Sequence, residues 1–216
     1  NTTRYIKYFL GILFIFTLVF SSETIMAKKK VKKIVIDAGH GGKDPGCHGT
    51  YSYEKDITLA VSKKLGKLIQ TELKETKVVY TREYDWYPEL KERTDFANKE
   101  KADLFISIHV NSTPKRNSPV KGTLVLVCGP TRISEKEGAI GENANNFEET
   151  EGLLDANDPI TQIIIAQYSQ AFLGQSIAFA SKINEEFSNQ GRVTEGIRQQ
   201  SLQVLASSAM PGVLIE

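Results

Sequence analysis

The stretch "KKIVIDAGHGGKDPG" (residues 32–46) joins an apolar run to a cluster of glycines, with a histidine at the junction. Residues 34–36 have the composition of a buried strand, and the glycines that follow predict a tight turn. In α/β proteins, the side chains at the carboxyl end of a buried strand reach the edge of the sheet where ligands bind. We therefore expect His40 to lie at such an edge.

Strand and helix patterns alternate along the rest of the chain. Apolar runs predict strands at 33–37, 77–82, 103–110, 122–129, 202–207 and 211–216, and helical spacing predicts helices at 54–73, 89–102 and 161–187. The run "DLFISIHV" at 103–110 is apolar on both faces, as parallel strands are. The alternation predicts an α/β fold with a single, mostly parallel but mixed sheet of about six strands and helices on both faces.

The first 27 residues have a different pattern. Arg4 and Lys7 precede an apolar run at 8–20, and a polar segment follows it and ends at Ala27. This order predicts a secretory signal peptide at residues 1–27. An uncleaved N-terminal anchor is the alternative, although the run is short for a membrane-spanning helix. We therefore expect an exported protein of the periplasm or cell envelope.

The remaining residues, 28–216, are expected to form one domain. The whole chain has a net charge of +1, and its lysines and carboxylates are interspersed. This distribution gives no electrostatic basis for binding nucleic acid. Because the chain ends inside an apolar strand, we expect the domain to be truncated at its C-terminus, and we expect a monomer.

Cys47 and Cys128 have no zinc-ligand spacing, so free thiols and one disulfide both stay open.

Two of the three histidines, His40 and His109, lie at the ends of predicted strands. Because the carboxyl ends of parallel strands meet at one edge, their imidazoles can share a metal. Glu54 begins the first helix, which must return beside the first strand. Two histidines and one glutamate form a catalytic zinc set that leaves a fourth position for water. The alternative is two hydrogen-bonded histidines and a glutamate favoured by the helix dipole.

The motifs "IVIDAGHGGKDPG", "EKDITLAVSKKL", "LKERTDFAN", "ADLFISIHVNS" and "MPGVLIE" resemble the zinc-dependent N-acetylmuramoyl-L-alanine amidases of the cell-separation and autolysin type, the Amidase_3 family. The resemblance covers roughly residues 33–216 in family order. It implies cleavage of the amide between N-acetylmuramic acid and L-alanine in peptidoglycan. It also implies that His40, Glu54 and His109 bind one Zn²⁺ and that Glu216 is the catalytic glutamate.

This assignment agrees with the chemistry of zinc hydrolases. Zinc activates water and polarises the carbonyl, and a carboxylate such as Glu216 takes the water proton and returns it to the leaving amine. Asn111 could bind substrate or support the site, or it could simply end a strand in a turn. Asp37 could orient His40, or it could have a structural role at the strand end.

Four other polar residues are expected to have structural or surface roles and not catalytic ones. Arg82 and Arg93 are interpreted as structural ion-pair partners. His48 and Cys47 lie in "GCHGT", whose turn residues predict an exposed loop. We expect a surface histidine and a loop thiol there.

A long acidic and polar stretch, near 131–160, separates the fourth strand from the long helix. Loops of this length in compact domains are usually functional or disordered. In the cell-separation branch of the family, a helix here covers the zinc site and supplies a glutamate until an activator protein displaces it. By this resemblance, "GENANN" (141–146) makes Glu142 the candidate inhibitory ligand. The alternative is a solvated acidic loop.

Two other functions remain as alternatives. One is a zinc peptidase that cleaves bonds within the stem peptides of peptidoglycan. The other is a catalytically inactive peptidoglycan-binding regulator, which the presence of all three ligands and Glu216 argues against. The products of peptidoglycan digestion would distinguish the zinc peptidase from the amidase. Metal analysis would distinguish the inactive regulator from the amidase.

Overall fold

A computed structural model of the protein describes residues 30–113, 118–144 and 158–216. The predicted signal peptide lies outside these residues. Within them, no helix combines the length and apolar character needed to cross a membrane.

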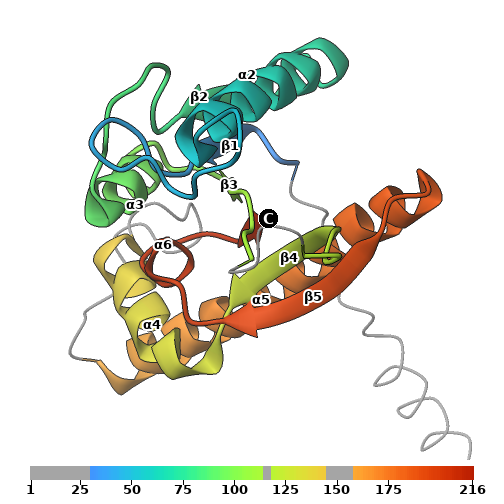
Figure 1. Cartoon of the computed structure of the whole chain (residues 1–216). Helices are drawn as coiled ribbons and strands as arrows, with labels where there is room; N and C mark the ends of the chain where they lie inside the picture. Colours follow the sequence, from blue (N-terminus) through green and yellow to red (C-terminus); the bar gives the residue numbers. More distant parts are fainter. Residues whose placement is uncertain (1–29, 114–117, 145–157) are drawn as a thin grey trace, which may run out of the picture. The chain divides into compact units, whose positions relative to one another are not determined.

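The core is one six-stranded sheet with the strand order β2-β1-β3-β6-β4-β5 (Figure 1). Its strands are β1 (Lys33–Ala38), β2 (Lys77–Tyr80), β3 (Leu104–Ile108), β4 (Thr123–Cys128), β5 (Thr194–Gln200) and β6 (Gly212–Ile215). Strands β2, β1, β3 and β6 run parallel, β4 is antiparallel to β6, and β5 is parallel to β4. The register places Ile108 beside both Ala38 and Ile215. The carboxyl ends of β1, β3 and β6 therefore lie side by side.

Helices cover both faces of the sheet, which confirms the predicted architecture. They are α2 (Glu54–Glu72), α3 (Leu90–Lys99), α4 (Ile133–Glu142), α5 (Pro159–Asn189) and α6 (Gln203–Ala206), with a 3₁₀ turn, η1 (Pro130–Arg132). Successive strand residues point to opposite faces. Ile36 of β1 packs in the cluster with α2 and α5, and its neighbour Val35 packs in the cluster with α3 and α6.

The predicted strand at 202–207 is wrong. The segment forms the short helix α6, and Val204 and Leu205 point from it into the core. A short apolar run does not distinguish a buried strand from a buried helical turn. The sixth strand is instead β5 at the sheet edge, which the sequence did not reveal because most of its side chains are polar and all are half-buried or exposed.

The stretch near 131–160 is only partly an insertion. Its first part forms η1 and α4, and Ile140 of α4 is 1% exposed in a cluster with Ile165 of α5. The buried side chains show that α4 belongs to the packed fold. Residues 145–157 lie outside the described part of the chain.

Candidate metal centre

His40 lies in a sharp turn directly after β1. Its φ of 60° is in the left-handed region, and the next two residues, Gly41 and Gly42, also have positive φ. Residues other than glycine rarely adopt this conformation, which costs roughly 1–2 kcal/mol. Arg93 Nη2 donates a 2.8 Å hydrogen bond to the His40 carbonyl oxygen, which helps to stabilise the turn.

Two arginines, each 2% exposed, lie beneath this turn. Arg82 donates to the carbonyl oxygens of Ala38 and Gly39 at 2.9 and 2.8 Å. Arg93 donates to Asp37 Oδ1 and to the Ala38 carbonyl, both at 2.8 Å. Arg93 is therefore the structural ion-pair partner that the sequence suggested. Arg82 is not, because its hydrogen bonds within the described chain go to backbone carbonyls and one hydroxyl.

Asp37 supports the turn but does not contact the imidazole of His40. Besides Arg93, it accepts hydrogen bonds from Thr81 Oγ1 at 2.6 Å and Ser107 Oγ at 2.7 Å. Burial alone would raise the pKa of Asp37, but the charge of Arg93 and these hydrogen bonds hold it below its usual value. Of the two roles that the sequence left open for Asp37, these contacts favour the structural one at the strand end, since Asp37 reaches His40 only through Arg93 and the backbone.

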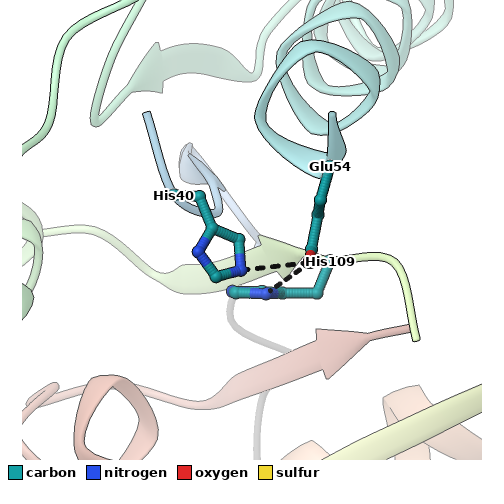
Figure 2. A group of neighbouring side chains, drawn as sticks. All are labelled: His40, Glu54 and His109. Carbon is teal, nitrogen blue, oxygen red and sulfur yellow. Dashed lines mark hydrogen bonds and ion pairs between the residues drawn. The ribbon is translucent and has the colours of Figure 1, made fainter. Parts of the chain in front are cut away.

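The side chains of His40, Glu54 and His109 converge at the carboxyl edge of the sheet (Figure 2). Glu54 is the first residue of α2 and is 3% exposed. Its Oε1 lies 3.2 Å from His40 Nε2 and 3.1 Å from His109 Nδ1. One ligand atom from each residue lies within 4.8 Å of the other two. The structure thus brings together the three residues that the sequence singled out.

Two glycines make this approach possible. A Cβ on Gly39 would lie 2.5 Å from atoms of the His109 ring. A Cβ on Gly46, whose φ is +66°, would lie 2.7 Å from both Glu54 Oε2 and the His40 ring. Any side chain at either position would push the three residues apart, which explains the glycines of the opening motif.

The electrostatics of the site favour a cation. Burial by itself would raise the pKa of Glu54, but hydrogen bonds with His109, His40 and the backbone N–H groups of Cys47 and Val110 outweigh it and hold the pKa well below its ordinary value. Glu54 is therefore ionised at neutral pH. Its hydrogen bond also raises the pKa of His40, against the opposing effect of burial.

The sequence analysis missed the partner of His40, which is Asp44. The Asp44 Oδ2 atom lies 2.8 Å from His40 Nδ1. A ring that donates its Nδ1 proton to this carboxylate has Nε2 left for a metal ion, which would replace the hydrogen bond between Nε2 and Glu54. The signal was present in "HGGKD", where a turn returns the carboxylate four residues after the histidine.

The donor set suits a tetrahedral metal ion. Zinc binds imidazole nitrogen at about 2.0–2.1 Å, so neighbouring ligand atoms of a tetrahedral site lie about 3.3 Å apart. The two distances from Glu54 Oε1, 3.2 and 3.1 Å, are close to this spacing. Two neutral nitrogens and one carboxylate oxygen also leave a fourth position for water or substrate. The three residues could therefore hold a divalent metal without moving far.

A pocket of roughly 250 Å³ opens above the three residues, and both Asn111 and Glu216 line it. Glu216 follows β6, and its backbone exchanges two hydrogen bonds with Leu124 of β4, at 2.9 and 3.0 Å. Burial raises the pKa of Glu216; His109 opposes this effect and the charge of Glu54 adds to it. A carboxyl group with a raised pKa beside a candidate metal site is suited to exchange protons with substrate.

The other sequence-predicted residues lie around or outside the pocket. His48 is exposed and stacks on Tyr53 with ring centroids 4.7 Å apart, as expected for a loop residue. Cys47 is half-buried and lines the pocket, and both cysteines are free thiols. Glu142 is an exposed residue at the end of α4. Among the described residues, the metal-binding group does not include it, so the structure does not place Glu142 as an inhibitory ligand.

Comparisons with known proteins show the family of the chain. Residues 34–216 match the Amidase_3 family, described as N-acetylmuramoyl-L-alanine amidase. A Buchnera aphidicola protein named for the same activity is 31% identical over 201 residues, which span 85% of this chain and 79% of that protein. AmiC of Escherichia coli O6:H1 is 30% identical, and the match covers 85% of this chain and 44% of AmiC. The solved catalytic domain of the amidase CwlV, from Bacillus (Paenibacillus) polymyxa, is 27% identical with a TM-score of 0.54, covering 86% of this chain and 79% of that one. The chain therefore belongs to the Amidase_3 family of N-acetylmuramoyl-L-alanine amidases, which act on peptidoglycan.

Proposed function

We propose that His40, Glu54 and His109 bind one zinc ion and that Glu216 is the proton-transfer residue of the amidase reaction. The observation that carries this proposal is the convergence of two imidazoles on one ionised, buried carboxylate at the floor of a pocket. The family match supplies the reaction, which is hydrolysis of the amide between N-acetylmuramic acid and L-alanine.

The residues divide the chemistry between them. Zinc, when bound, acts as a Lewis acid that polarises a carbonyl and lowers the pKa of water at the site towards about 7. Glu216 takes a proton from the attacking water and donates it to the departing amine of L-alanine. Its raised pKa suits this exchange, because the group must be a base in one step and an acid in the next. Asp44 accepts the Nδ1 proton of His40, so that Nε2 is the nitrogen that would bind the metal.

The substrate can extend to either side of the metal centre. A second pocket of roughly 150 Å³ shares His40 and His109 with the first and continues towards Tyr87 and Gln203. An amide bound at the three residues would therefore have room on both sides for the sugar and the peptide. Asn111, at the rim of the first pocket, is our candidate for a hydrogen bond to substrate.

We also propose that the protein is exported and acts as a monomer in the cell envelope. Peptidoglycan lies outside the cytoplasmic membrane, so its hydrolase has to reach that compartment. The signal-peptide pattern of residues 1–27 provides the route. A protein activator that acts on the insertion near 131–160 is also part of this proposal.

Digestion of purified peptidoglycan tests this function. We expect the chain to release intact stem peptides that begin with a free L-alanine amine and to lose this activity with a chelator. Cleavage within the stem peptides would indicate the zinc peptidase instead. Release of no product by a zinc-loaded protein would indicate the inactive regulator.

The Glu216→Gln variant tests the role of the carboxylate separately. It keeps the size of the side chain and removes the base, so turnover should fall by roughly 10²-fold or more while zinc stays bound. Glu72→Gln, an exposed position at the end of α2, is the matched control. Near-normal activity of Glu216→Gln would place the base elsewhere.

A further inference from the structure

The segment at residues 207–210, "SSAM", connects α6 to β6 and is largely buried. Ser208, Ala209 and Met210 are all at most 4% exposed. The strand β6 begins two residues after Met210, and Glu216 follows its last residue. The placement of this segment therefore determines where β6 begins and, over a strand of only four residues, where Glu216 lies.

A buried lysine of α4 binds this segment. Lys136 is 4% exposed, and its Nζ donates to the Met210 carbonyl at 2.6 Å, to Ser208 Oγ at 3.1 Å and to the Leu205 carbonyl at 3.1 Å. An ammonium group has three donors, so all three are used. Burial lowers the pKa of Lys136 to about 8, so the group still carries its charge at neutral pH. An apolar side chain would fill the same space without the cost of burying a charge, but it could not fix three oxygens in position.

Neighbouring residues restrain the same segment. Ser207 Oγ donates to Glu135 of α4 at 2.5 Å. Asn98 of α3 donates to the Ser207 carbonyl at 3.0 Å and accepts from the Ala209 N–H at 2.8 Å. The short helix α6 packs against both α3 and α4 here, and Figure 1 shows it between them. Among these side chains of α3 and α4, Lys136 binds the residue nearest to β6 in the sequence, Met210.

The strand transmits the position of its first residue to its last. Gly212 N donates to Ser176 Oγ of α5 at 2.9 Å, which restrains the start of β6 from the opposite face. At the other end, Ile215 pairs with Ile108 of β3 and Val125 of β4. Because β6 has only four residues, the contacts that hold Met210 before it and the pairing with β3 and β4 together determine where Glu216 lies.

We propose that Lys136 is a positioning residue for Glu216. It fixes the turn before β6 and so sets the carboxylate against the metal centre, although it contacts neither metal ligand nor substrate. The inference rests on the proposed function, because it takes Glu216 as the proton-transfer residue. It also gives α4 a role in catalysis that is distinct from any inhibitory contact of the insertion.

The Lys136→Met variant tests the inference, because it keeps the length and volume of the stem and removes the ammonium. We expect kcat on peptidoglycan to fall about tenfold, since small misplacements of catalytic groups cost this much or more. KM and zinc content should stay at the parent values. Lys182→Met, which removes an exposed lysine from α5, is the control and should change none of the three.

A milder variant covers the case in which Lys136→Met does not fold. Ser208→Ala removes one of the three acceptors and should lower kcat about two- to threefold, again with unchanged KM and zinc content. If either folded variant has the parent kcat, or if the loss appears in KM or zinc content instead, Lys136 does not position the catalytic carboxylate.

A double-mutant cycle separates this inference from the proposed function. If Lys136 acts through Glu216, the Lys136→Met change should cause no further loss of the residual activity of Glu216→Gln. Independent, multiplying losses would overturn the inference and leave the role of Glu216 standing. Full activity of Glu216→Gln alone would overturn the proposed function, and with it the inference that depends on it.

Discussion

Two buried carboxylates near the same sheet edge have opposite surroundings. Asp37, 1% exposed, has a permanent cation, Arg93, at 2.8 Å and two hydroxyl donors. Glu54, also buried, faces two imidazoles and two backbone N–H groups, and no lysine or arginine of the described chain forms an ion pair with it. Arg93 thus neutralises Asp37 within the fold, whereas Glu54 has only imidazoles and backbone N–H groups beside it, as expected of a candidate metal ligand. The difference distinguishes the scaffold from the metal centre.

Removal of the negative charge of Asp37 should have the largest effect on stability. The change Asp37→Asn leaves Arg93 buried without its anion, and breaking a buried pair typically costs about 3–5 kcal/mol. The free energy of unfolding in urea measures the loss. Asp95→Asn, which removes an exposed partner of Lys91, should cost no more than about 1 kcal/mol. Equal effects of the two substitutions would show that the buried pair has no special role.

The same substitution changes the response to acid. The pKa of Asp37 is lower in the folded protein than in the unfolded chain, so its stabilising contribution is complete above the unfolded value of about 3.9 and declines as the pH falls through the folded value. The parent should lose more stability than Asp37→Asn between about pH 4 and pH 2. Parallel stability curves for the two proteins would contradict this account of Asp37.

A smaller effect is expected at the partner of His40. Asp44→Ala removes the carboxylate that fixes the ring tautomer, and loss of such partners typically lowers metal affinity about 10- to 100-fold. The folded state should remain, because Asp44 is half-exposed. Competition with a zinc indicator dye measures the affinity, and Asp56→Ala, an exposed position near the start of α2, is the control. If Asp44→Ala bound zinc with the affinity of the parent, Asp44 would have no role in the metal centre.

The smallest effect is expected from the insertion. The pocket at the candidate metal centre has room for another carboxylate, whereas the surroundings of Asp37 are filled. The segment 145–157, outside the described residues, contains Glu148, Glu149 and Glu151. Replacing this segment with a short Gly-Ser linker leaves α4 and α5 intact and should raise the basal hydrolysis of peptidoglycan several-fold, because a carboxylate that reaches the metal competes with water. A folded, zinc-loaded deletion that hydrolyses no faster than the parent would show that the segment is not inhibitory.

The comparison also shows what the sequence could reveal. His40 and His109 were predictable because both follow apolar strands, and parallel strands end at one edge. Asp44 was missed because its approach depends on positive φ angles at residues 40–42, which the sequence does not display directly. Lys136 was missed for a different reason. It lies in a polar stretch where lysines are normally exposed, and only the packing of α4 on α6 reveals that it is buried.

Zinc binding by three proteins tests the central claim, that Glu54 is neutralised by a metal held with His40 and His109. The parent, His109→Ala and the surface control His48→Ala are stripped with a chelator, dialysed against excess zinc and analysed for metal per chain. We predict one zinc in the parent and in His48→Ala, and little or none in His109→Ala, because one nitrogen and one carboxylate remain. Full occupancy in folded His109→Ala would contradict the account.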